Sequence, residues 1–251
     1  MAATKQLRIG VFIPASVQLL DLSGIDLFDM ITPEYLKLCG LPPPLISLGV
    51  PSTIHYISVP EKGSHVELTA KVVLQVSRTI DDPDVQPGML DIVLVPGPEP
   101  GTIFETKVLE YLRGHAEWKG ENGQTTDILS VCTGCSMLGQ AGILKGKHAS
   151  GPRALVPRLR KEFPETSWDD SKRWVQDGNV WTSGGITNGQ EMVAAYLRYN
   201  FPGPTTEAVL SMADVGEKGL DYGKSVARVQ LGWLWWILKA LTVGGGKQKK
   251  L

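Results

Sequence analysis

The chain has 251 residues, of which 42% are hydrophobic and 20% are charged, and its formal net charge is −1. This composition is that of an ordinary globular protein with ample core, and the near-zero charge argues against nucleic acid or an anionic membrane as a partner. The length allows one large α/β domain, which we place at residues 1–243, followed by a flexible tail at 244–251.

Cysteine usage favours a reducing, cytoplasmic location. Cys39, Cys132 and Cys135 cannot all pair with one another, and their spacing matches no metal site. No N-x-S/T glycosylation site is present, and the first eight residues lack the apolar core of a signal peptide. The sequence also contains neither a P-loop nor a dinucleotide-binding glycine motif, so we expect no cofactor and no metal.

The first third of the chain opens with a continuous apolar run (LRIGVFIP) of the kind that forms buried parallel strands. A helix follows, although Pro33 occupies an awkward position inside it. The last two strand candidates alternate like hairpin or edge strands. The predicted elements are a strand at 7–14, a helix at 25–38, and strands at 45–50, 54–59 and 66–68.

The middle of the chain repeats a pattern of strand, loop and helix. A buried strand at 91–96 leads into a loop rich in Gly and Pro at 97–101 and then a helix at 103–118. Another apolar strand ends at Cys132, where a helical stretch begins.

The last third is predicted to contain a helix, a strand pair and then only helices. Residues 153–163 form the helix, and a Gly-rich turn at 183–189 follows the strand pair. A helix at 191–199 comes next, and two more helices close the chain.

Strands that alternate with helices predict a flavodoxin-like three-layer α/β sandwich, with a mostly parallel sheet and helices on both faces. In open sheets of this type, ligands bind outside the carboxyl ends of the strands. The loops after Pro14, Pro96, Val131 and Trp181 are therefore the predicted walls of the functional site.

An apolar run at 231–243 (LGWLWWILKALTV) is too short to span a bilayer and contains Lys239. It predicts a helix that is either buried against the chain's own core or placed at a contact between subunits. Trp233, Trp235 and Trp236 supply its largest apolar side chains.

The turn at Cys132 carries the strongest chemical signal in the sequence. An apolar strand ends there, Gly134 follows, and a helix starts, which is the pattern of a nucleophile elbow. Unpaired N–H groups at a helix N-terminus favour an anion and lower the pKa of a thiol, so we expect Cys132 to be a reactive thiolate. The alternative is a small buried cysteine that only packs.

These segments resemble the ThiJ/PfpI superfamily, a branch of the class I glutamine amidotransferase-like fold. The resemblance runs from about residue 7 to residue 200. Four motifs carry it: residues 21–24 (DLSG), 94–97 (LVPG), 131–134 (VCTG) with 141–147 (AGILKGK), and 182–186 (TSGGI) with Glu191.

The resemblance implies that Cys132 is the nucleophile and that Asp21 is its acidic partner. A carboxyl group beside a thiolate is pushed towards its protonated form and can relay a proton to the substrate. Asp26 is the competing carboxylate, and Asp21 has the alternative role of a helix N-cap.

The resemblance also implies backbone N–H donors for developing negative charge at Thr133 and in the Gly97 loop. Pro98, Gly185 and Ile186 are expected to line the substrate site. The family further implies a small-molecule substrate and a homodimer.

Two departures from the family pattern narrow the function. Pro152 stands where the family often has a histidine, so a Cys-His dyad and peptide hydrolysis are poorly supported. Pro98 stands where the family commonly has a second Gly, and proline has no N–H to offer an oxyanion. His115 and Glu117 show the spacing of an amidotransferase pair but precede Cys132, and we interpret them as a solvated helix face.

We therefore predict a cofactor-independent hydratase or lyase of isonitrile hydratase type, a branch that pairs an aspartate with Cys-Thr and does not rely on the histidine. A tailoring role in small-molecule biosynthesis is compatible with it. The alternatives are a glyoxalase III-type enzyme, a non-catalytic redox sensor that uses Cys132, and a ligand-binding scaffold. Cys135, three residues after Cys132, is expected to be core packing rather than a redox partner.

Overall fold

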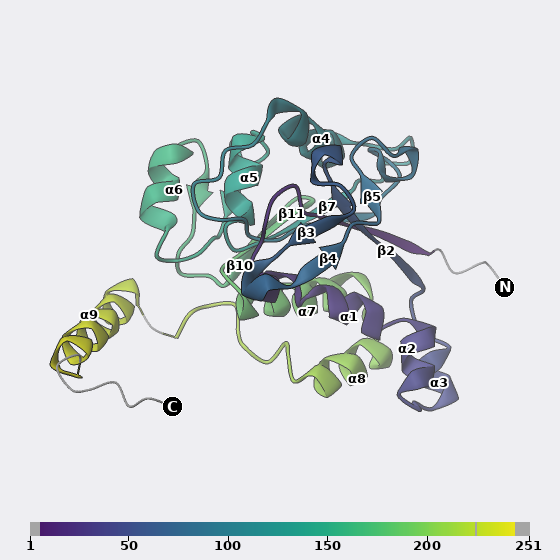
Figure 1. Ribbon diagram of the computed structural model, residues 1–251. Helices are drawn as coiled ribbons and strands as arrows, with labels where there is room; N and C mark the ends of the chain where they lie inside the picture. The colour runs from purple at the N-terminus through teal and green to yellow at the C-terminus, as the bar shows by residue number, and fades with distance from the viewer. Residues whose placement is uncertain (1–5, 224, 244–251) are drawn as a thin grey trace.

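The computed structural model describes residues 6–223 and 225–243. Seven strands form its central sheet: β1 (Leu7–Phe12), β2 (Ser52–Ser58), β5 (Arg78–Thr79), β6 (Ile92–Val95), β7 (Asp127–Val131), β10 (Trp174–Asp177) and β11 (Val180–Ser183). Their spatial order is β10-β11-β7-β6-β1-β2-β5 (Figure 1). Every neighbouring pair is parallel except β10 and β11 at one edge, so the predicted, mostly parallel sheet is confirmed.

Helices cover both faces of the sheet (Figure 1). On one face lie α1 (Ile25–Met30) and α7 (Thr187–Asn200), with α8 (Pro204–Ala213) packed against both. On the other lie α4 (Thr106–Glu117) and α5 (Gly134–Gln140), with α6 (Val156–Glu162) beside α5. Side chains along each strand alternate between two hydrophobic cores: Ile92 and Leu94 of β6 enter one, and Val93 and Val95 enter the other. This is the predicted three-layer sandwich.

Two predictions in the first third are wrong because prolines start helices there. The predicted helix at 25–38 is divided into α1 and α2 (Pro33–Leu38), since Thr32 caps α2 and Pro33 occupies its first turn. The predicted strand at 45–50 is instead the end of α3 (Pro43–Ile46) and the loop that follows, because two prolines fit the first turn of a helix.

The predicted strand at 54–59 corresponds to β2, which lies one strand in from the sheet edge rather than at the edge or in a hairpin. The prediction of a hairpin at 66–68 is confirmed by β3 (His65–Glu67) and its antiparallel partner β4 (Val73–Gln75). The remaining small elements are β8 (His148–Ala149) paired with β9 (Ser167–Trp168), and the 3-10 helices η1 (Leu19–Leu22), η2 (Pro60–Lys62), η3 (Thr69–Lys71) and η4 (Pro83–Val85).

The C-terminal third follows the prediction with shifted boundaries. The antiparallel pair β10–β11 is confirmed. The helix predicted at 153–163 begins at Val156, with Pro157 in its first turn, and the helix predicted at 191–199 begins earlier, at Thr187. The start of α7 was placed too late because it lies inside the Gly-rich segment at 183–189, which was interpreted as a turn.

The last helix, α9 (Val226–Val243), extends away from the sheet (Figure 1). Packing of this segment on the chain's own core is contradicted, because Trp235 and Trp236 are each 62% exposed and their large apolar neighbours are exposed as well. Among the described residues, no helix combines the length and the hydropathy needed to cross a membrane. The predicted tail at 244–251 lies outside the described residues.

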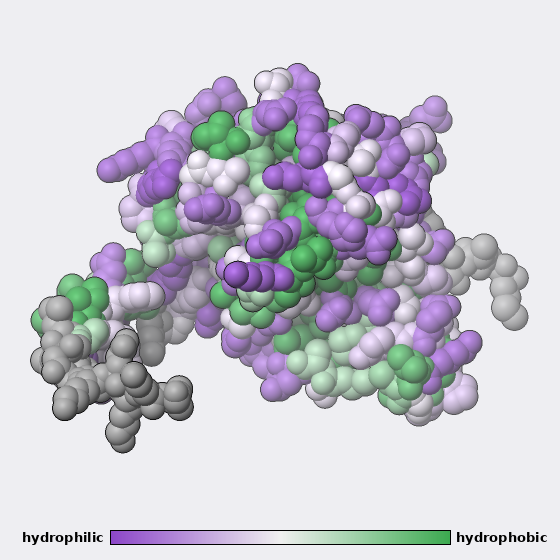
Figure 2. Space-filling view, in the orientation of Figure 1, coloured by the Kyte–Doolittle hydropathy of each residue, from purple (hydrophilic) through white to green (hydrophobic). Residues whose placement is uncertain are grey.

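A second apolar area lies on the body of the molecule. Figure 2 shows hydrophobic surface over the β3–β4 hairpin, where Val72 and Val73 are exposed. The hairpin packs beside the carboxyl ends of the strands through Thr69, whose N–H donates to the Val17 carbonyl and whose hydroxyl accepts from the Leu19 N–H.

Candidate active site

Cys132 lies at a sharp turn between β7 and α5. Its φ is +57°, a left-handed conformation that non-glycine residues rarely adopt and that is often concentrated at functional sites. Gly134 allows the helix to start this close to the sheet, because any side chain there would collide with the Val95 carbonyl. The strand-turn-helix geometry expected from the sequence is therefore present, and it holds the sulfur at the carboxyl end of the sheet.

All seven predicted site residues line one cavity of about 390 Å³ around the sulfur: Asp21, Gly97, Pro98, Cys132, Thr133, Gly185 and Ile186. They come from the four loops predicted to form the walls. The volume is within the range of small-molecule sites.

The cavity has six further lining residues that were not predicted: Ser16, Val17, Gln18, Thr69, Glu99 and Pro100. Glu99 and Pro100 belong to the Gly-Pro loop already recognised in the sequence, so their position could have been inferred. Thr69 gave no signal, because it enters from the β3–β4 hairpin through tertiary packing.

Asp21 is the buried carboxylate of this cavity, whereas Glu99 is exposed. The Asp21 side chain is only 1% exposed, and its Oδ1 accepts a hydrogen bond of 2.9 Å from the Ile186 N–H. Its Oδ2 has no hydrogen-bond partner among the described residues. Asp26, the competing candidate, is exposed on α1, and Gly24 rather than Asp21 occupies the N-cap of that helix.

Ile186 and two glycines shape the surroundings of this pair. Ile186 has a φ of +55°, and this unusual conformation directs its N–H at Asp21. A Cβ atom on Gly97 would lie 2.5 Å from Asp21 Oδ2 and 2.7 Å from Thr133 Oγ1, and one on Gly185 would lie 3.2 Å from the Cys132 sulfur. Both glycines therefore permit the close approach of Asp21, Cys132 and the Gly97 loop.

The electrostatics of the pair differ from the sequence-based expectation of a low thiol pKa. Burial, followed by the neighbouring charge of Asp21, raises the pKa of Cys132 to about 12, while the N–H and hydroxyl of Thr133 act in the opposite direction. Burial also raises the pKa of Asp21, although the Ile186 N–H, the Cys132 thiol and the Gly97 N–H oppose that effect. Cys132 is thus favoured as the neutral thiol, because burial outweighs the Thr133 groups at the start of α5.

The Gly97 loop is tied to both sides of the cavity. The Gly97 carbonyl accepts a 2.9 Å hydrogen bond from the Gln18 N–H, and the Pro98 carbonyl accepts one of 2.5 Å from the Thr133 hydroxyl. Pro98 has no N–H of its own, as expected, and the neighbouring Gly97 N–H acts to lower the pKa of Asp21. The backbone N–H of Thr133 is directed at the sulfur.

No histidine is among the residues that line this cavity. The interpretation of His115 as part of a solvated helix face is wrong: its ring is fully buried, stacks edge-on against Tyr111, and lies 3.1 Å from the Val85 carbonyl. Burial lowers the pKa of His115 to about 4, so the ring is neutral at physiological pH.

Two further residues singled out in the sequence, Cys135 and Glu191, are buried and do not line the cavity. Cys135 is fully buried in the core on the α5 side, which confirms the expectation of packing. Glu191 is buried on α7 and accepts a hydrogen bond from the Lys218 N–H, and it does not line the cavity. Among the residues that the structure describes, no group of three His, Cys, Asp or Glu side chains lies close enough to hold a metal ion.

Comparisons with known proteins agree with this architecture. The chain is 36% identical over 129 residues to an isonitrile hydratase from Pseudomonas putida, an alignment that covers 49% of this chain and 50% of that protein. The chain thus matches about half the length of this curated relative.

Solved structures share the fold at low sequence identity. A ThiJ/PfpI family protein from Pseudomonas syringae superposes with a TM-score of 0.65 at 17% identity, over 94% of this chain and 88% of that one. Drosophila melanogaster DJ-1beta superposes with a TM-score of 0.61 at 16% identity, over 84% and 99% respectively. The sequence profile of the DJ-1/PfpI family matches residues 43–199, which is more than half of the chain. The chain therefore belongs to the DJ-1/PfpI family.

Proposed function

We propose that this protein is a cofactor-independent hydratase that converts small isonitriles to N-substituted formamides, with Cys132 as nucleophile and Asp21 as proton relay. The observation that carries the proposal is the pairing of a thiol with a buried carboxylate in one small-molecule cavity that no histidine lines. The similarity to the Pseudomonas putida isonitrile hydratase supports the same reaction class.

The proposed reaction begins with transfer of the thiol proton to the carboxylate of Asp21, which leaves the net charge of the pair unchanged. The sulfur bonds to the terminal carbon of the isonitrile, and Asp21 delivers its proton to that carbon, giving a thioimidate. Water then adds to the same carbon, with Asp21 accepting one of its protons. The C–S bond breaks, the nitrogen gains a proton, and formamide and thiol are released. Such proton transfers by a positioned carboxyl typically contribute about 10²–10⁴-fold to the rate.

Backbone groups assist this chemistry in the proposal. The Thr133 N–H stabilises negative charge at the sulfur and at the atoms bonded to it. Pro98 removes one donor from the loop and adds apolar surface, which suits an uncharged isonitrile better than the oxyanion of an amide. The side chain of Ile186 and the backbone of Gly185 complete the proposed substrate wall.

The test is turnover of cyclohexyl isocyanide, with N-cyclohexylformamide measured by mass spectrometry. Cys132→Ser is expected to abolish turnover. The matched control is Cys39→Ser, which makes the same replacement at an exposed cysteine outside the cavity and should retain full activity. Lack of conversion by the wild-type protein would refute the hydratase.

The same assay separates the alternatives. Conversion of α-oxoaldehydes but not of isonitriles would indicate a glyoxalase III-type enzyme. No turnover, together with selective oxidation of Cys132 by mild peroxide, would indicate a redox sensor.

We further propose that the protein works in the cytoplasm as a homodimer and that α9 forms the subunit contact. The exposed apolar side chains of α9 support this assembly. Single exposed apolar residues are common on protein surfaces, but the exposed apolar residues of α9 follow one another closely along one helix. A contiguous apolar surface of this kind usually marks an interaction site.

A further inference from the structure

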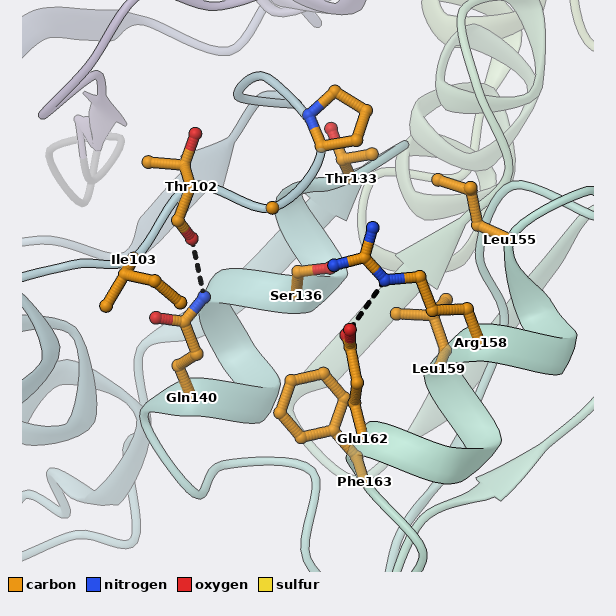
Figure 3. Close-up of a pocket in the computed structure, with 12 residues that line it drawn as sticks. Thr102, Ile103, Thr133, Ser136, Gln140, Leu155, Arg158, Leu159, Glu162 and Phe163 are labelled. Atoms are coloured by element: carbon orange, nitrogen blue, oxygen red, sulfur yellow. Dashed lines mark hydrogen bonds and ion pairs between the residues drawn. The ribbon is translucent and has the colours of Figure 1, made fainter.

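A second cavity, of about 290 Å³, adjoins the one that contains Cys132. Thr133 and Pro100 line both cavities, so only this ridge separates them. Figure 3 shows the second cavity between α5, α6 and the loop at 100–103. Ser136 of α5 lines it, four residues beyond Cys132 in the chain.

The polar groups of this cavity are not equally available. The Gln140 amide is fully engaged: it donates to the Thr102 carbonyl at 2.9 Å and accepts from the Phe104 N–H at 3.2 Å, which fixes the loop. Arg158 uses only its Nε, in a 2.6 Å ion pair with Glu162. In the part of the chain that the structure describes, no hydrogen bond engages the two terminal nitrogens of Arg158 or the hydroxyl of Ser136.

Arg158 spans the cavity. Its guanidinium extends from α6 towards α5 (Figure 3), and its Nη2 lies 3.6 Å from the position that a Cβ atom on Gly101 would occupy. The pair with Glu162 is solvent-exposed, so it is weak and does not compete strongly for the guanidinium. The terminal edge of a guanidinium has the geometry to bind a carboxylate through two parallel hydrogen bonds.

Most of the remaining lining is apolar, and Thr102 and Thr133 are its other polar residues. Ile103, Leu155, Leu159 and Phe163 surround the guanidinium, with Ile103 at the exposed rim. The Glu162 carboxylate also lines the cavity, where it occupies the Nε edge of Arg158 and leaves the terminal edge of the guanidinium open. An apolar wall beside that open edge suits a hydrocarbon chain that ends in a carboxylate.

We propose that this cavity is a substrate-tail site, which binds the carboxylate-terminated aliphatic tail of a substrate whose reactive carbon reaches Cys132. The proposal rests on the proposed function and adds a substrate class to it, the isocyano carboxylates. Arg158 sets this preference from outside the cavity that contains the sulfur.

The first experiment compares turnover of 6-isocyanohexanoate and hexyl isocyanide, which have equal chain lengths and differ in terminal charge. The wild-type protein should prefer the carboxylate about tenfold in kcat/KM, the effect of roughly one charge-assisted contact. Arg158→Gln should erase the preference by raising the KM for 6-isocyanohexanoate about tenfold. Lys161→Gln is the matched control, because it removes one positive charge from the same helix outside the cavity.

The second experiment needs no turnover. Calorimetric binding of hexanoate and hexanamide to the Cys132→Ser protein should favour hexanoate about tenfold, and Arg158→Gln should remove that difference. Equal binding of the two ligands, or an unchanged preference in Arg158→Gln, overturns the substrate-tail site. Arg158-dependent binding of hexanoate without turnover of any isonitrile overturns the hydratase alone and leaves the substrate-tail site standing.

Discussion

Burial and then the charge of Asp21 raise the pKa of Cys132, and the Thr133 N–H at the start of α5 offsets only part of that rise. A negative carboxylate beside a buried sulfur makes thiolate formation unfavourable, so the pKa of the thiol rises. In the proposed resting state, a thiol beside a carboxylate, the pair shares one negative charge, and moving a proton between the two groups costs less than ionising both. This arrangement suits a nucleophile that is activated when a substrate arrives and is otherwise protected from oxidation.

Replacement of Asp21 separates intrinsic thiol reactivity from catalysis. Asp21→Asn removes the negative charge, so the pKa of Cys132 falls from about 12 while remaining above the usual range because the burial persists. Each unit of decrease gives about tenfold more thiolate at pH 8, and alkylation by iodoacetamide should accelerate accordingly. Turnover should fall about 100-fold or more, because the proton relay is lost.

The measurement is the rate of alkylation between pH 6 and pH 10 in a Cys39→Ser background, beside the isonitrile assay. Slower alkylation of Asp21→Asn would contradict the proposed resting state. It would mean that a protonated Asp21 supports the thiolate in the wild-type protein.

The two glycines of the site give a second prediction at the residue scale. Gly97→Ala places a methyl group 2.5 Å from Asp21 Oδ2, so we expect a loss of about 1–3 kcal/mol in the free energy of unfolding and loss of turnover. Gly185→Ala places its methyl 3.2 Å from the sulfur, and a smaller effect on both is expected. Urea unfolding and turnover of the two variants test this order, and a more damaging Gly185→Ala would contradict it.

At the scale of elements, local sequence patterns located most strands but placed helix ends poorly. Continuous apolar runs identified β1, β6 and β7, since strands buried on both faces are apolar throughout. Two prolines were misinterpreted. Pro33 was expected to lie inside one long helix and instead starts α2, and Pro43 starts α3 just before the segment that was predicted to be a strand.

The capping of α2 can be tested directly. The Thr32 hydroxyl accepts from the Tyr35 N–H at 3.2 Å and donates to the Asp29 carbonyl at 2.7 Å, so it stabilises both the start of α2 and the end of α1. Thr32→Ala should lower the free energy of unfolding by about 1 kcal/mol. Ser47→Ala is the control, because it removes an exposed hydroxyl and should change stability by less than about 0.5 kcal/mol. Equal effects of the two variants in urea unfolding would contradict the capping role.

At the scale of the whole molecule, α9 extends away from the α/β sandwich (Figure 1). Its large apolar side chains at 231–238 are exposed, and a groove of about 520 Å³ lies between it and the body at Arg153 and Ala154. A helix that is apolar over most of its surface is stable in water only when something covers it. A second copy of the chain is the occupant that we propose.

Dimer formation through α9 predicts a change in mass. The double variant Trp235→Ser/Trp236→Ser should elute as a monomer at micromolar concentration, where the wild-type protein elutes as a dimer in size-exclusion chromatography with light scattering. Leu38→Ser is the control, because Leu38 is a large side chain that is 83% exposed on α2, far from α9 in the sequence. A wild-type monomer, or a variant that remains a dimer, would contradict the proposal.

The sequence by itself determined the parallel α/β architecture and the turn at Cys132, because apolar runs and a glycine two residues after a strand are local signals. It also identified the four loops of the site, since parallel strands place their carboxyl ends at one edge. Only the tertiary structure decided between Asp21 and Asp26, because the choice depends on a hydrogen bond from Ile186 across 165 residues. The raised pKa of Cys132, the burial of His115 and the exposure of α9 were equally undetermined. Burial is a property of how elements pack together, and the periodicity of a single element does not contain it.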